Sequence, residues 1–258
     1  MLSYLLIALA SLVTAGLTLF SGFGLGTLLL PVFALFFPLE MAIALTAVVH
    51  LANNLFKLAL VGRQANWRIV LTFGLPAFAA AFFGAWVLFW LAHFPPLSTY
   101  QLFGRTLFVA PVKLAVAVLM VIFALWDILP RLKAITFPPR FLPLGGLFSG
   151  FLGGLSGHQG ALRSAFLLRA GLTKDAFIGT GVVIACVVDL SRLTVYFQHF
   201  VLADLAANAP ILLTAVTAAF LGSFLGSRVL KKVTLAAVQL IVGLMLFLVA
   251  LALGLGLI

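Results

Sequence analysis

Long apolar runs, separated by short polar connections, recur along the whole 258-residue chain. A helix needs about 20 predominantly apolar residues to cross a hydrocarbon core of about 30 Å. The stretches that we expect to cross are 41–61, 68–92, 106–129, 175–198, 205–228 and 234–257. Because no polar stretch is long enough to fold separately, the pattern predicts a single all-α polytopic membrane domain over residues 1–258.

Basic residues mark one side of this domain. Lys and Arg gather in alternate connections, and the connections between them are poor in both. The basic clusters are Arg63 and Arg68; Arg131, Lys133 and Arg140; Arg169 and Lys174; and Arg228, Lys231 and Lys232. The positive-inside rule places these clusters in the cytoplasm, so both termini are expected on the opposite side.

Two apolar segments, 1–38 and 141–170, begin and end on the same side and are therefore predicted to be helical hairpins. Three crossings follow each hairpin, in opposite orientations. The string FSGF at 20–23 recurs at 148–151, and AAFFG at 80–84 resembles AAFLG at 218–222. We therefore expect two inverted repeats, at about 1–129 and 141–258, joined by a cytoplasmic linker at about 130–140.

Glycines interrupt both hairpins, in GFGLG at 22–26 and GGLSGHQG at 153–160. Glycine allows the backbone to turn, and a helix N-terminus formed there favours an anion. Close helix packing is the alternative role. Breaks at corresponding places in inverted repeats are typical of secondary transporters that bind substrate near the midplane. The glycines expected to shape the hairpin backbone are Gly22, Gly24, Gly26, Gly154, Gly157 and Gly160.

Polar side chains inside apolar spans are costly and must face protein or water. In the first half they fall at helical spacing on one stripe, which comprises His50, Asn53, Asn54 and Lys57. Asp189 and Arg192 stand three residues apart in the second half. Two facing polar stripes would line a cavity. The alternatives are a structural Asp189–Arg192 ion pair and a Lys57 side chain that reaches the interface.

The second hairpin adds His158, Gln159 and Arg163, which carry hydrogen-bond donors and a positive charge suited to an anion. The residues expected to bind substrate are therefore His50, Asn53, Asn54, Lys57, His158, Gln159, Arg163 and Arg192. Asp189 is the acidic residue near the centre of a predicted span, so it is the expected proton carrier. His50 and His158 are alternatives, because histidine titrates near neutral pH.

Composition narrows the remaining possibilities. Hydrophobic residues make up 65% and charged residues 8% of the chain, and the mean hydropathy is +1.31. The net charge of +10 is confined mainly to short connections, which argues against nucleic-acid binding. A lone cysteine, Cys186, and four scattered histidines predict neither disulfide, metal site nor other cofactor. No catalytic triad or P-loop is recognisable, so an enzyme is not expected and an ion or proton gradient is the remaining energy source.

Several motifs together resemble the TauE/SafE sulfite exporter family. They are GFGLGTLLLP at 22–31, AIALT at 42–46, GRQANWR at 62–68 and a Gly/Ala-rich helix at 74–85, with GGLFSGFLGGLSG and AFIGTGVV in the second half. The resemblance covers nearly the whole chain. It implies export of sulfite, or of an organosulfonate such as sulfoacetate, from the bacterial cytoplasm across the inner membrane, driven by the proton gradient. With the basic clusters inside, both termini are expected in the periplasm, and alternating access is expected from one repeat moving against the other.

The second hairpin departs from the family pattern, because HQGA at 158–161 replaces a proline-containing segment. Arg163 and the neighbouring donors would suit a sulfonate or carboxylate on a larger anion. The expected partners are this small anion, protons and the lipid bilayer. A passive anion channel and a non-transporting membrane scaffold or assembly protein are the alternative functions. The oligomeric state, coupling stoichiometry and depth of the hairpins are left open by the sequence.

Overall fold

The computed structural model of the chain describes residues 1–21, 25–102, 104–200, 206–229 and 235–258. Within these ranges the fold is helical apart from one two-stranded β-hairpin. Apolar side chains cover much of the outer surface, as they do in a protein surrounded by lipid. The prediction of an all-α polytopic membrane protein is thereby confirmed.

The helices and strands follow one another in two similar series. The first comprises α1 (Leu2–Ser21), α2 (Leu25–Ala34), α3 (Leu39–Val61), the short η1 (Gly62–Gln64), α4 (Trp67–Ala92), β1 (Ser98–Leu102), β2 (Arg105–Val109) and α5 (Pro111–Ile128). After α6 (Pro130–Lys133) and η2 (Pro139–Phe141), the second comprises α7 (Leu142–Ser156), α8 (Gly160–Leu167), α9 (Lys174–His199), α11 (Ala209–Val229) and α12 (Leu235–Gly254).

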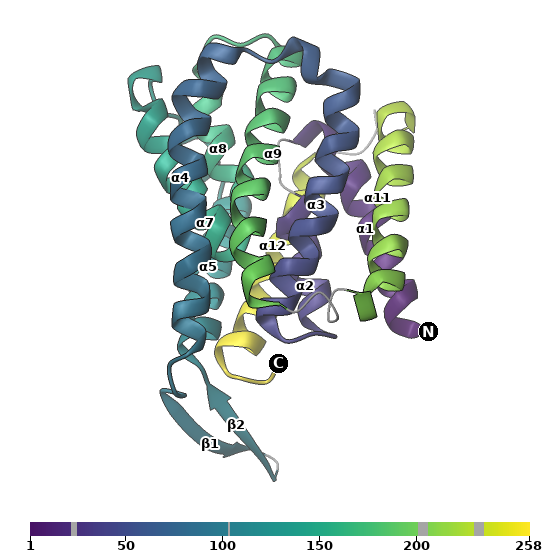
Figure 1. Cartoon of the computed structure of the whole chain (residues 1–258), viewed down its shortest axis with the longest axis vertical. Coiled ribbons are helices and arrows are strands. Elements are labelled where there is room, and N and C mark those ends of the chain that lie inside the picture. The colour runs from purple at the N-terminus through teal and green to yellow at the C-terminus, as the bar shows by residue number, and fades with distance from the viewer. Residues whose placement is uncertain (22–24, 103, 201–205, 230–234) are drawn as a thin grey trace.

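Four of the described helices, α3, α4, α9 and α11, are long and apolar enough to cross a membrane. They correspond to four of the predicted crossings. The apolar parts of α5 and α12 are shorter over the described residues, at 111–126 and 243–254. The N- and C-terminal ends lie at the same end of the bundle (Figure 1), which agrees with the even number of crossings predicted from the sequence.

The predicted start of the third crossing at residue 106 is wrong. Residues 105–109 form β2, which pairs antiparallel with β1 and projects from one end of the bundle (Figure 1). Gly104 has a φ of 74° in the connection between the strands. The helix begins instead at Pro111, whose fixed φ suits a first helical position and whose missing N–H costs nothing there.

Both predicted hairpins are broken helices with short second arms. α2 has 10 residues and α8 has 8, so they span about 15 and 12 Å, roughly half of the hydrocarbon thickness. α7 ends at Ser156 and is capped by Gly157, whose φ of 81° is the left-handed conformation that favours glycine. Gly160 then starts α8, whereas Gly22 and Gly24 lie outside the described residues.

The start of α2 lies against the break in the second hairpin. A Cβ atom built on Gly26, in the first turn of α2, would lie 3.4 Å from the Gly157 carbonyl oxygen. It would also lie 3.9 Å from the His50 ring. The hairpins therefore bring their tips to one place beside α3.

The first arms of the hairpins pack on helices of the other half through backbone contact. A Cβ on Gly150 of α7 would lie 2.1 Å from the Ala77 carbonyl oxygen of α4, and one on Gly222 of α11 would lie 2.0 Å from that of Leu12 in α1. Thus the first helix of each half contacts the fourth helix of the other. The division into inverted repeats stays a prediction, and this exchange of partners fits it.

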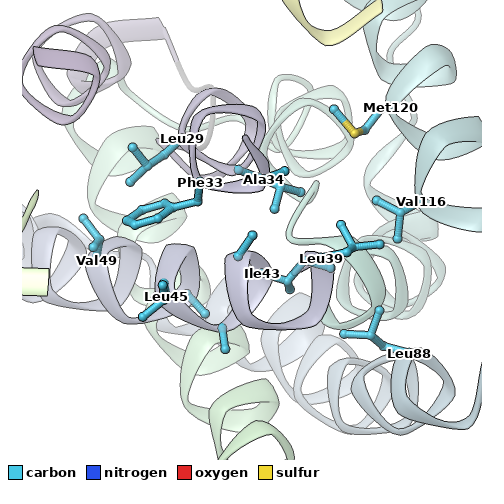
Figure 2. Close-up of a cluster of buried hydrophobic side chains, with 14 of the residues drawn as sticks. Leu29, Phe33, Ala34, Leu39, Ile43, Leu45, Val49, Leu88, Val116 and Met120 are labelled. Carbon is cyan, nitrogen blue, oxygen red and sulfur yellow. The ribbon is translucent and has the colours of Figure 1, made fainter. Parts of the chain in front are cut away.

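The core around α2 explains how the first hairpin is held. Nine of the ten α2 residues are buried. Figure 2 shows Leu29 and Phe33 of α2 directed toward Leu45 and Val49 of α3. Because α2 is apolar on all sides, it is stable only when enclosed by other helices.

Candidate functional site

Asp189 of α9 lies at the centre of a buried polar cluster and is fully inaccessible to solvent. Its Oδ2 is 2.6 Å from His50 Nδ1 on α3. Its Oδ1 accepts two hydrogen bonds from Arg192, from Nε at 3.0 Å and from NH2 at 2.7 Å. A buried carboxylate needs such partners, because an unpaired charge in a low-dielectric interior is strongly unfavourable.

Helical periodicity positions the two sides of this cluster. His50, Asn54 and Lys57 lie on one face of α3, and Asp189 and Arg192 lie one turn apart on α9. Asn54 Nδ2 donates to Asp189 Oδ2 over 3.3 Å. The two stripes predicted from the sequence therefore face each other.

The break in the second hairpin contributes the third side. Gln159 Nε2 donates to Asp189 Oδ1 at 3.5 Å, and its Oε1 accepts from Arg163 NH1 at 3.3 Å. Arginine only donates and a carboxylate only accepts, so a single amide orientation serves both partners. Ser149 Oγ donates to the Gln159 carbonyl and fixes the turn.

The glycines of this hairpin also supply carbonyl groups to α9. Arg192 NH1 donates to the Gly153 carbonyl at 3.3 Å. The Tyr196 hydroxyl donates to the carbonyl of Gly154. Because α8 follows directly at Gly160, these contacts fix where its first turn and Arg163 lie.

A small cavity of about 40 Å³ borders the cluster. This volume is enough for water or a few atoms of a small ligand. Its walls come from α1, α2, α3, α8 and α9, and its lining residues are Thr18, Leu25, His50, Asn54, Lys57, Arg163, Ser164, Leu167, Phe177, Ile178, Gly181 and Val182.

The cavity carries excess positive charge. Lys57 and Arg163 are 5% and 7% exposed, and neither forms a salt bridge with any carboxylate of the described residues. Asp189, the buried carboxylate, is already paired with Arg192. Two buried cations at a cavity without acidic lining residues favour an anion there.

Two of the expected site residues lie elsewhere. Asn53 points to α11, where its Oδ1 accepts from Ser223 Oγ at 2.7 Å. His158 stacks on Phe123 with ring centroids 5.4 Å apart, and its Nδ1 lies 3.1 Å from the Ser156 carbonyl oxygen. Neither residue lines the cavity. Arg192 and Gln159 contact Asp189 and stand behind the cavity wall.

Other residues at the site were not singled out from the sequence. Thr18, Phe177 and Gly181 line the cavity, and Ser149 and Tyr196 hold the second hairpin. Gly181 lies eight residues before Asp189, so extending the α9 stripe by two turns would have found it. Thr18 lies on α1, which is apolar on all sides, so the sequence does not show which side of this helix faces the cavity.

The described residues contain no group of three His, Cys, Asp or Glu side chains that could hold a metal ion. The site is thus built from hydrogen-bond donors, one buried acid–base pair and two cations, Lys57 and Arg163, that form no salt bridge among the described residues.

Comparison with known proteins supports one assignment. The family model described as "Sulfite exporter TauE/SafE" matches residues 6–253, nearly the whole chain. A search of individually curated proteins finds no match. Because the match extends over both hairpins and the helices that follow each of them, the chain belongs to the TauE/SafE sulfite exporter family.

Proposed function

We propose that this protein exports a small sulfur-containing anion, sulfite or an organosulfonate such as sulfoacetate, across the bacterial inner membrane. Family membership supports anion transport. The observation that carries the proposal is the pair of buried cations, Lys57 and Arg163, at a cavity with no acidic residue in its lining. Buried positive charge of this kind is retained where it has a ligand to bind.

Within this proposal, the cavity wall contributes more than charge. His50 and Asn54 line the cavity beside the two cations. Imidazole and amide groups can donate hydrogen bonds to sulfonate or sulfite oxygens, while the cations supply the electrostatic attraction. Asn53, His158, Gln159 and Arg192 would support the site from behind its wall in this conformation.

Asp189 is the proposed proton carrier, with His50 as its partner. The 2.6 Å separation of His50 Nδ1 and Asp189 Oδ2 is a hydrogen-bond distance, so these two titratable groups beside the cavity can share a proton. His158 remains an alternative carrier. A buried acid–base pair of this kind is typical of proton relays in membrane transporters.

Alternating access supplies the proposed transport cycle. The cavity-lining residues Lys57 and Phe177 lie near the end of the bundle that carries the basic residues Arg63 and Arg169. The tips of the hairpins meet at Gly26 and Gly157 beside His50, about two turns of α3 before Lys57. We infer that the cavity opens toward this end of the bundle in one state of the cycle, and that export requires the hairpin tips to separate.

Thermal unfolding of the detergent-purified protein tests the binding step. The panel comprises sulfite, thiosulfate, sulfoacetate, taurine, acetate and sulfate. A bound ligand stabilises the folded state by mass action, so selective stabilisation by a sulfur anion is expected and should disappear in Arg163→Gln. Arg169→Gln removes an exposed arginine six residues away and should keep the response.

Transport in proteoliposomes separates the exporter from a channel or a scaffold. Anion efflux should respond to an imposed pH gradient, and Asp189→Asn should abolish that response. Efflux that ignores the gradient in the unaltered protein would identify a channel. A folded protein that neither binds nor moves any of the anions would be a scaffold.

A further inference from the structure

The titratable groups around the cavity lie on α3, α8 and α9 and on the turn before α8. On α3 these groups are His50 and Lys57; on α8, Arg163; and on α9, Cys186, Asp189, Arg192 and Tyr196, with His158 on the neighbouring hairpin turn. Whichever of them takes up a proton, the local charge becomes more positive by one unit. The described parts of α1 and α2 contribute only uncharged lining residues, Thr18 and Leu25.

Asp189 is closely connected to the cavity although it does not line it. It contacts His50 and Asn54, both of which do. Through Gln159 it is also linked to Arg163, because the amide bridges the carboxylate and the guanidinium. In an interior of low dielectric, charges at such separations interact strongly.

Protonation of the His50–Asp189 pair therefore removes negative charge beside the anion site. It also weakens the hydrogen bond from the Gln159 amide to Asp189. The Gln159 side chain, which accepts a hydrogen bond from Arg163, is then less firmly fixed, and the Arg163 guanidinium can reorient toward a ligand. Both effects increase anion affinity. By thermodynamic reciprocity, a bound anion increases proton affinity by the same factor.

We propose that the anion and a proton bind to this site cooperatively and are carried through the membrane in the same direction. This inference rests on the proposed function and adds the relative direction in which the proton and the anion move. An exchanger would need the opposite relation, in which proton binding expels the anion. The contacts of Asp189 favour the cooperative relation, because they link the carboxylate to His50, to Asn54 and, through Gln159, to Arg163, all of which line the cavity.

Cotransport also sets the driving force. A doubly charged anion that leaves with one proton still carries negative charge outward. The inside-negative membrane potential then favours export even though the proton moves against its own gradient. The reaction is balanced, because one anion and one proton leave the site together and nothing is oxidised or reduced.

The test measures anion affinity and proton exchange in the detergent-purified full chain. Thiosulfate and sulfoacetate are suitable probes because their charge is constant between about pH 6 and about pH 8, where histidine-coupled sites titrate. We expect affinity to increase by about threefold to tenfold per unit fall in pH. In weakly buffered solution, binding should take up protons from the medium.

Variants identify the group responsible. Asp189→Asn imitates the protonated carboxyl group and should bind the probes at high pH with little pH dependence. Asp175→Asn, which removes an exposed aspartate from the first turn of the same helix, should keep the wild-type dependence. The proton-uptake measurement on the unaltered protein needs no variant, so it stays decisive if Asp189→Asn does not fold.

The outcomes separate the two proposals. Binding accompanied by proton release, or affinity that falls with acidification, overturns cotransport while leaving anion export intact. Binding with no proton exchange also overturns it. If no anion of the thermal panel binds at any pH, the proposed function fails and this inference fails with it.

Discussion

His50 and Asp189 lie 139 residues apart in the chain, yet the His50 Nδ1 and Asp189 Oδ2 atoms are 2.6 Å from each other. This contact joins α3 to α9 at the place where the two hairpin tips meet. The polar cluster is therefore both a structural connection between the halves and the centre of the proposed transport site. Substitutions can separate these two roles.

Lys57→Met should weaken binding of a sulfur anion by about tenfold or more without lowering stability. Lys57 makes no salt bridge among the described residues, so removing its buried charge costs no partner. Titration followed by thermal unfolding measures both quantities. Arg68→Gln, at an exposed arginine in the first turn of α4, serves as the control. Unchanged affinity in Lys57→Met would exclude this lysine from the site.

Arg192→Met, unlike Lys57→Met, should lower stability, by about 3–5 kcal/mol in the free energy of unfolding. It removes the two hydrogen bonds of the Arg192 guanidinium to Asp189 Oδ1 and leaves a buried carboxylate underpaired. A double variant with Asp189→Leu should recover much of this loss. Denaturant unfolding of the set as a double-mutant cycle measures the coupling. Additive effects would show that the pair is not energetically linked.

Gly150→Ala should destabilise the contact between α4 and α7 by about 1–3 kcal/mol, since inserting a methyl group into a filled interface forces the backbones apart. The added Cβ would lie 2.1 Å from the Ala77 carbonyl oxygen. Gly74→Ala is a matched control, because its Cβ would meet side-chain atoms no closer than 3.7 Å. Equal melting temperatures of the two variants would contradict this close packing.

Ser223→Ala should lower stability by about 1–3 kcal/mol and leave anion affinity unchanged. The substitution deprives buried Asn53 Oδ1 of its donor at 2.7 Å, and Asn53 lies away from the cavity lining. Thr214→Ala on the same helix removes a hydroxyl bonded to its own helix and should cost less. If Ser223→Ala lowered anion affinity without lowering stability, Asn53 would have to be counted among the binding residues.

The β-hairpin shows where prediction from a local pattern fails. Residues 106–110 are apolar enough to extend a predicted crossing, yet 105–109 pair with 98–102. Tyr100 OH also donates to the Leu255 carbonyl, so β1 is held by the last part of the chain. Both interactions depend on residues elsewhere in the chain, and a local hydropathy pattern carries no information about them.

The sequence by itself determined the membrane class, the broken hairpins and the polar stripes of α3 and α9. These features follow from hydropathy and from the helical period, which depend only on neighbouring residues. The predicted α3 stripe included Asn53 as well as Asn54. Adjacent residues lie about 100° apart around a helix, and the helical period alone does not show which of two neighbours at the edge of a stripe faces the cavity.

Tertiary structure decided the contacts that polar residues make between helices. Packing turned Asn53 to Ser223 and joined His50 to Asp189, and it left Lys57 and Arg163 at the cavity. The pair of Asp189 and Arg192, three residues apart on one helix, was already an alternative in the sequence. The physical reason is that a buried charge is defined by its partners, and those partners come from segments more than a hundred residues away, as for His50 and Asp189.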